Sequence, residues 1–183
     1  MTRYLLAGAA LVVLVAAPAK AAVTVIGNGM AHACAEAARH GQADIDSMRA
    51  CDSALATEDL DPRDFAGTFV NRAILEMIQR DYVRARMDLD HAIGIQPRLG
   101  AAWANRGAVS LGQHRYQEAL ADINKGLELG VEEAEKVYFN RALVYEGLDD
   151  EHSAYFDFEQ AATLSPNWDL PKQELLRFTV TRP

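Results

Sequence analysis

The chain has 183 residues and a net charge of −8, with 18 Lys and Arg against 26 Asp and Glu. This balance excludes a basic nucleic-acid footprint as the main binding surface, and at about 150 residues per domain the length predicts one domain or one array of repeats. Two cysteines exclude a disulfide-dense miniprotein and a four-cysteine zinc site.

Residues 1–22 have the parts of a secretory leader. A basic start is followed by an uninterrupted small and apolar run at residues 5–17, and Ala19 and Ala21 are small at the two positions that a signal peptidase reads. A transmembrane helix needs about 20 apolar residues, more than this run supplies. We predict a signal peptide cut after Ala21 or Ala22 and an exported protein, in a bacterial periplasm. A retained N-terminal anchor is the alternative.

The next segments are expected to be a spacer and a cap. Residues 23–29 contain Gly-Asn-Gly and are predicted to be a flexible spacer, and residues 30–65 a degenerate N-terminal helical hairpin. Cys34 and Cys51 fall in different helices of this hairpin, so they can face each other and form a disulfide in an oxidising compartment. The alternatives are two reduced core thiols, or a metal site formed with the two histidines His32 and His40.

The rest of the chain repeats itself three times. Each block starts with an aromatic residue, one variable residue and then Asn-Arg followed by Ala or Gly, and the Asn residues are Asn71, Asn105 and Asn140. Each block contains two apolar stripes at helical spacing, the second ended by a proline or a glycine. Because one helix pair cannot cover its own apolar faces, the blocks must stack on one another.

This spacing and content resemble the tetratricopeptide repeat. The resemblance covers residues 66–166 and implies an all-α fold, a right-handed solenoid of antiparallel helix pairs. The repeats, a C-terminal capping helix and a tail are then expected at 66–99, 100–134, 135–166, 167–178 and 179–183.

One polar pairing recurs with the repeat. In each block an Arg precedes an Asp by 16 positions, and we predict that the Arg on the first helix forms a bidentate ion pair with the Asp on the second. A groove lining that binds ligand is the alternative role for these residues. The pairs are Arg72 with Asp88, Arg106 with Asp122, and Arg141 with Asp157.

The resemblance also implies a binding surface, because the first helices of tetratricopeptide folds line a concave side that receives a peptide. The three Asn residues are expected to hydrogen-bond a ligand backbone, or only to tie adjacent first helices together. A charged clamp for a C-terminal carboxylate is not expected, since apolar residues stand before each Asn. The implied lining is Val70, Asn71, Ile74, Met77, Ala101, Ala104, Asn105, Ala108, Phe139, Asn140 and Leu143.

The sequence offers little catalytic chemistry. The histidines are scattered, and the serine-hydrolase elbow and the His-Glu-x-x-His zinc motif do not occur. We predict an exported interaction module, an adaptor or assembly factor, that binds a protein or peptide and uses no cofactor or metal. The alternative is an enzyme, or a small-molecule or metal binder, built on Cys34, Cys51 and His40.

Overall fold

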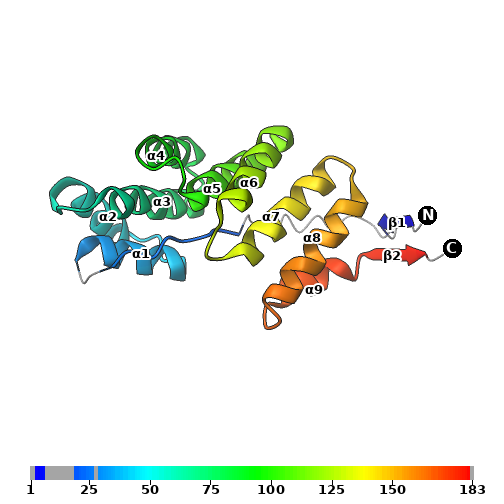
Figure 1. Cartoon of the computed structure of the whole chain (residues 1–183). Coiled ribbons are helices and arrows are strands. Elements are labelled where there is room, and N and C mark those ends of the chain that lie inside the picture. The colour runs from blue at the N-terminus through cyan, green and yellow to red at the C-terminus, as the bar shows by residue number, and fades with distance from the viewer. Residues whose placement is uncertain (1–2, 7–18, 27–28, 182–183) are drawn as a thin grey trace.

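The computed structural model describes residues 3–6, 19–26 and 29–181, and these form nine helices and two short strands. Figure 1 shows the helices in a stacked array with the two ends of the chain together beside the last pair. The helices are α1 (Met30–His40), α2 (Ile45–Thr57), α3 (Pro62–Ile78), α4 (Tyr82–Ile95), α5 (Gly100–Gly112), α6 (Tyr116–Leu129), α7 (Ala134–Gly147), α8 (Glu151–Leu164) and α9 (Asp169–Leu175), and the strands are β1 (Arg3–Leu6) and β2 (Phe178–Thr181).

The helices form four hairpins that stack in sequence order. Within each hairpin the two helices pack together, and the first helices α3, α5 and α7 also contact one another in series. The expected all-α solenoid of antiparallel pairs is therefore confirmed. Small residues allow the close crossings: a Cβ on Gly107 of α5 would lie only 2.6 Å from the Ile123 side chain of α6.

The turn inside each full repeat has the same backbone. Its central residue is left-handed, with φ of 63° at Arg80, 58° at His114 and 59° at Asp149. Residues other than glycine rarely adopt this backbone conformation. The repeat period places all three residues at equivalent positions. The turn then leads into α4 and α8 through Asp81 and Asp150, whose side chains accept hydrogen bonds from the helix N–H groups.

The first hairpin is joined by the expected disulfide. Cys34 of α1 and Cys51 of α2 form the bridge and are fully buried. At the other end α9 packs on α8, and the Trp168 ring lies 4.9 Å from that of Phe139, which closes the last hairpin. The capping helix is shorter than the 167–178 predicted.

Two segments differ from the sequence-based expectation. Residues 178–181, within the expected tail and the end of the expected cap, form β2, which pairs antiparallel with β1 from the expected leader. The expected spacer 23–29 is ordered where it is described, because Val23 and Val25 are buried between helices. Residues 27 and 28 of that spacer, and most of the leader, lie outside the described residues.

Candidate functional site

The three repeated asparagines hold an extended segment of the same chain. Asn71, Asn105 and Asn140 lie at equivalent positions of α3, α5 and α7 and are buried. We call the surface that they share the groove, and residues 19–26 the N-terminal segment. Figure 1 shows this segment running along the stack toward α1.

Each Asn binds one residue of the N-terminal segment through both of its backbone groups. Asn71 Oδ1 accepts from the Val23 N–H at 2.9 Å, and its Nδ2 donates to the Val23 carbonyl at 2.9 Å. Asn105 makes the same pair with Ala21, at 3.3 and 2.8 Å. Asn140 makes it with Ala19, at 2.8 and 2.6 Å. The side-chain amides therefore hydrogen-bond the backbone of every second residue, as a neighbouring strand does in a β-sheet.

Polar groups hold the segment at other points too. The Ala22 N–H donates to Glu133 Oε2 at 2.9 Å, and the Thr24 hydroxyl donates to Glu132 Oε2 at 2.9 Å. His32 Nδ1 lies 3.2 Å from the Val25 carbonyl oxygen. Both edges of the extended backbone are therefore bound.

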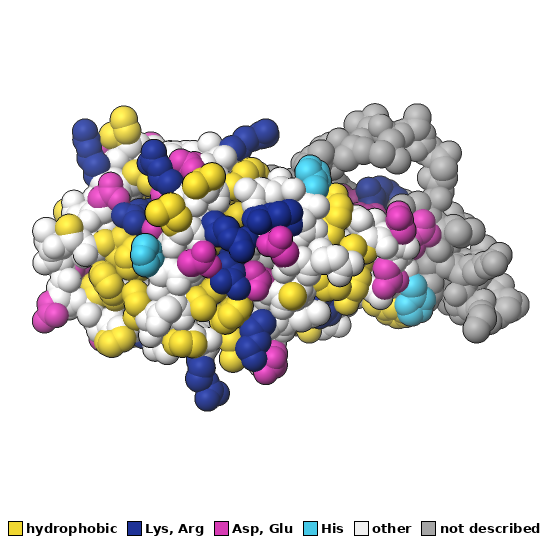
Figure 2. Space-filling view, turned by 90° about the horizontal axis from the view of Figure 1, so that it is seen from above, with side chains coloured by type: hydrophobic (Ala, Val, Ile, Leu, Met, Phe, Trp, Pro, Cys, Tyr) yellow, Lys and Arg dark blue, Asp and Glu magenta, His cyan; other side chains and the backbone are white. Residues whose placement is uncertain are grey.

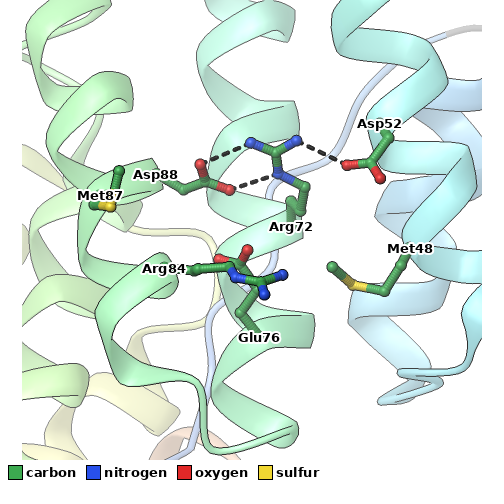
Figure 3. A pocket seen from close by; sticks show the side chains of 7 residues that line it. All are labelled: Met48, Asp52, Arg72, Glu76, Arg84, Met87 and Asp88. Carbon is green, nitrogen blue, oxygen red and sulfur yellow. Dashed lines mark hydrogen bonds and ion pairs between the residues drawn. The ribbon is translucent and has the colours of Figure 1, made fainter.

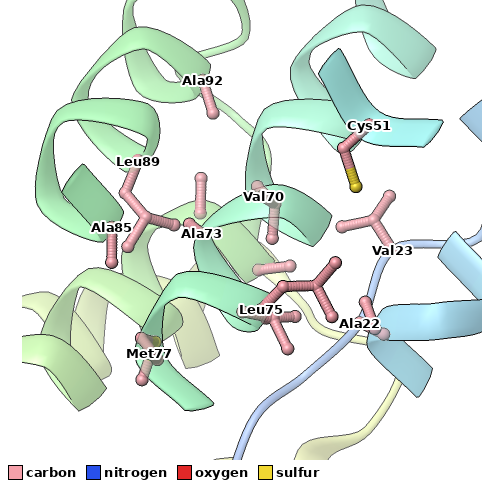
Figure 4. Packing of buried hydrophobic residues seen from close by; sticks show 14 of the residues in the cluster. Ala22, Val23, Cys51, Val70, Ala73, Leu75, Met77, Ala85, Leu89 and Ala92 are labelled. Carbon is pink, nitrogen blue, oxygen red and sulfur yellow. The ribbon is translucent and has the colours of Figure 1, made fainter. Parts of the chain in front are cut away.

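Side chains of the segment fill small spaces among the helices. Ala21, Val23 and Val25 are only 3%, 2% and 2% exposed, while Ile26 is 81% exposed. Val23 points toward α3 (Figure 4), and a Cβ on Gly67 of that helix would lie 2.8 Å from Val23 Cγ1. The groove therefore accepts small or β-branched side chains and leaves no room above Gly67.

The one cation among these residues is electrostatically disfavoured. Lys20 is half-buried, and burial lowers the pKa of its ammonium group. The positive charge of Lys136 on α7 lowers that pKa further. The segment is thus held through its backbone and its small side chains, and not through its charge.

The other residues implied as groove lining lie mostly in the core. Val70, Ile74, Met77, Ala101 and Ala108 belong to one buried cluster with Val23 and Ala22, and Ala104 packs in a second cluster with Ala21. Leu143 is half-buried between the second cluster and a third. Phe139 lies in a cluster against which Ala19 of the N-terminal segment also packs. It is buried in the third cluster, 5.4 Å from the Phe158 ring, where it packs α7 on α8.

The structure makes all three Arg–Asp pairs with the same geometry. Arg Nε and Nη2 donate to the two carboxylate oxygens at 2.6 to 2.8 Å, within Arg72–Asp88, Arg106–Asp122 and Arg141–Asp157. These hydrogen bonds raise the pKa of each guanidinium group. The pairs join the two helices of one repeat and do not contact the N-terminal segment.

Each arginine also reaches the preceding hairpin, which the sequence analysis missed. The remaining nitrogen, Nη1, of each arginine donates a hydrogen bond at 2.8 Å. In chain order, the acceptors are Asp52 of α2, Asp90 of α4 and Asn124 of α6. The sequence contains a sign of these contacts, because Asp90 stands two residues after Asp88 and Asn124 stands two residues after Asp122. Each guanidinium therefore ties its own repeat to the one before it.

One of these arginines lines an open pocket of about 230 Å³ (Figure 3). Glu76 lies one turn after Arg72 on α3, is buried, and has one carboxylate oxygen without a hydrogen-bond partner. Burial, followed by the charge of Asp88, raises the pKa of Glu76 to about 8. The remaining lining residues are Met48, Asp52, Arg84 and Met87.

The proposed cysteine chemistry has no free thiol, because Cys34 and Cys51 are both in the disulfide. His40 is exposed and lies 3.4 Å from Glu36, one turn before it on α1. Within the described ranges, no group of three potential metal ligands comes together. Basic and acidic side chains are interspersed over the described part of the face in Figure 2.

None of the described helices is long and apolar enough to cross a membrane.

Comparisons with known proteins agree with the fold. Residues 135–167 match the family model of the tetratricopeptide repeat. A search of curated protein sequences found no match. The sequence match thus covers one repeat, and the described part of the chain has the solenoid fold of proteins built from such repeats.

Several solved structures share this fold at low sequence identity. MamA from Desulfovibrio magneticus is 20% identical with a TM-score of 0.58, over 82% of this chain and 84% of that one. A tetratricopeptide repeat protein from Parabacteroides merdae is 17% identical with a TM-score of 0.66, over 81% and 55%. The second such domain of human RPAP3, in complex with the HSP70 peptide SGPTIEEVD, is 23% identical with a TM-score of 0.57, over 64% and 97%.

Proposed function

We propose that this chain is an exported interaction module, an adaptor or assembly factor, whose groove binds an extended segment of a partner protein. The observation that carries the proposal is the repeated amide pairing: Asn71, Asn105 and Asn140 each bind both backbone groups of one residue, at every second position of an extended chain. Such pairing depends on backbone groups that every peptide has.

Side-chain space then sets the preference for a ligand. Positions equivalent to Ala21 and Val23 require small or β-branched residues, because the helices close around them. The RPAP3 domain, which shares the fold, is likewise found with a bound peptide. The proposal assigns no catalytic role, since the candidate thiols are oxidised to a disulfide.

The leader connects the groove to export. A cut after Ala21 or Ala22 removes the residues that Asn105 and Asn140 bind, and leaves Val23 with Asn71. The unprocessed chain then carries its own groove ligand, and processing opens two of the three Asn positions. A periplasmic location follows from the same leader.

Peptide binding to the processed protein tests the proposal. A fluorescent peptide with the sequence of residues 15–21 is titrated against protein purified from the exported fraction. Asn105→Ala and Asn140→Ala each remove two hydrogen bonds, worth about 1 kcal/mol apiece, so each should weaken binding about thirtyfold.

Asn167→Ala is the matched control, because this exposed residue follows α8 and lies outside the groove. It should leave the affinity unchanged, and circular dichroism should show equal helical content in all variants. Processed protein that does not bind the peptide, or binding that both groove substitutions leave intact, would rule out the groove as the site.

A further inference from the structure

The backbone of the N-terminal segment has one contact of a different kind. Where the Asn residues bind Ala19, Ala21 and Val23, the Ala22 N–H donates to a carboxylate, Glu133 Oε2, at 2.9 Å. Glu133 directly precedes α7, and Ala22 is only 6% exposed. The carboxylate thus lies at the nitrogen atom that becomes the N-terminus if the leader is cut after Ala21.

We propose that Glu133 binds the α-ammonium group of Ala22 after leader removal, so that the new N-terminus is seated in the groove and only the positions of Asn105 and Asn140 open. This inference rests on the processing step of the proposed function. A leader peptidase hydrolyses the Ala21–Ala22 bond: the hydroxyl of water goes to the Ala21 carbonyl carbon and a proton goes to the Ala22 nitrogen. At neutral pH the products are a carboxylate on Ala21 and an ammonium group on Ala22.

The cut strengthens the contact that already exists. The amide N–H already donates to an ionised acceptor, and the cut places a positive charge on the donor, which adds the attraction between opposite charges to the hydrogen bond. The other downstream contacts are unaffected: Val23 keeps its two bonds to Asn71, and the Val25 carbonyl keeps its contact with His32. Val23 and Val25 also stay buried against Gly67.

Charged side chains of both signs surround this contact. Glu133 Oε1 pairs with Lys136 of α7, and the neighbouring Glu132 Oε1 lies 3.5 Å from Arg63 of α3. Lys20, which Lys136 disfavours, leaves with the leader. The site therefore loses the poorly solvated ammonium group of Lys20 and gains that of Ala22, which lies next to the Glu133 carboxylate.

The part of the groove that opens defines the partner more closely. The vacated positions are those of Asn105 and Asn140, which bind the backbone of two residues separated by one. The partner is therefore an extended peptide with a small residue at the former Ala21 position, which packs with Ala104 and Leu111. Its chain continues past this position only by leaving the groove, because Ala22 occupies the next site.

Reactivity of the α-amine tests the proposal. An amine-acylating reagent is added to the exported protein, and N-terminal modification is followed by mass spectrometry over a range of pH. A free α-amine has a pKa of about 7.7–8.0, and a bound carboxylate should raise it by about one unit and slow acylation at pH 7 about tenfold relative to a free peptide with the sequence of residues 22–29.

Glu133→Gln should restore the free-peptide rate, whereas Glu132→Gln, which affects only the Thr24 hydroxyl and Arg63, should not. The pH at which acylation of the unaltered protein reaches half of its maximal rate gives the pKa of the α-amine without a variant. An intact mass that does not begin at Ala22, or an unaltered protein whose amine reacts like the free peptide, overturns the inference. A protected amine in protein that does not bind peptide at Asn105 and Asn140 would support this inference while the proposed function fails.

Discussion

Replacing Gly67 by alanine probes whether the N-terminal segment occupies the groove. The new Cβ would lie 2.8 Å from Cγ1 of Val23, whereas carbon atoms in contact are normally about 3.5–4.0 Å apart. The next nearest atoms are Val23 Cβ at 3.5 Å and Val25 Cγ2 at 3.7 Å, which are ordinary contacts. The clash is therefore with one methyl group of one residue of the segment.

The magnitude follows from two opposing effects. Forcing an extra methyl group into a packed site costs about 1–3 kcal/mol, and replacing Gly by Ala inside a helix returns about 0.8–1.0 kcal/mol. We expect Gly67→Ala to lower the free energy of unfolding by about 1 kcal/mol. In a Val23→Ala background the clashing atom is absent, so the same change should raise it by about 0.8–1.0 kcal/mol.

A double-mutant cycle measures this coupling. Urea unfolding of the parent, the two single variants and the double variant should give an interaction energy of about 1–3 kcal/mol in favour of the double variant. Val23 lies downstream of both expected cuts, so the cycle applies to processed and unprocessed protein. Gly94→Ala on α4 is the matched control, because nothing lies within 4 Å of its Cβ position.

Additive effects of Gly67→Ala and Val23→Ala would refute the reasoning, since residues that do not touch do not couple. So would a coupling of similar size between Val23→Ala and Gly94→Ala, because it would show that the effect is not local. The parent value is measured in each case with the disulfide intact.

Two further predictions concern stability. Glu76 has a pKa of about 8 in the folded protein against 4.5 ordinarily, so the folded state binds more protons and the free energy of unfolding should fall as pH rises from about 5 to 8, by up to about 1.4 kcal/mol per pH unit. In urea titrations at several pH values Glu76→Gln should remove this slope, and a slope that persists contradicts the assignment. Reducing the Cys34–Cys51 bridge, which closes a loop of 17 residues, should cost about 3 kcal/mol in guanidinium unfolding; a change below about 1 kcal/mol would show that the cap holds without it.

The features that repeat were predictable because each was present three times. The Asn positions and the spacing of 16 between Arg and Asp recur at a fixed period, so the helix pairs and the ion pairs follow from local pattern and stacking. The cysteine pairing followed from a hairpin and an oxidising compartment. Each of these contacts joins residues whose pairing is indicated by the repeat pattern or by the predicted hairpin.

The N-terminal segment was missed because its pattern has two meanings. Ala19, Ala21, Val23 and Val25 alternate with other residues, as an extended strand does, but the same small residues also form a cleavage site. Glu133 directly precedes α7, where an acidic residue complements the helix dipole, so its place in the sequence does not mark it as a partner of the segment. Only the fold brings residue 22 beside residue 133.

If the proposed leader is removed, the buried state of the segment restricts when the cut can be made. The backbone groups on both sides of the Ala21–Ala22 bond are engaged by Asn105 and Glu133, and Ala21 and Ala22 are themselves nearly inaccessible. A protease must draw a substrate out into its own cleft, so this bond could be cut only while the segment is outside the groove. Under the proposed processing, protein that folds first would keep its leader, and the competition between folding and cutting would set how much of the population has a vacant groove.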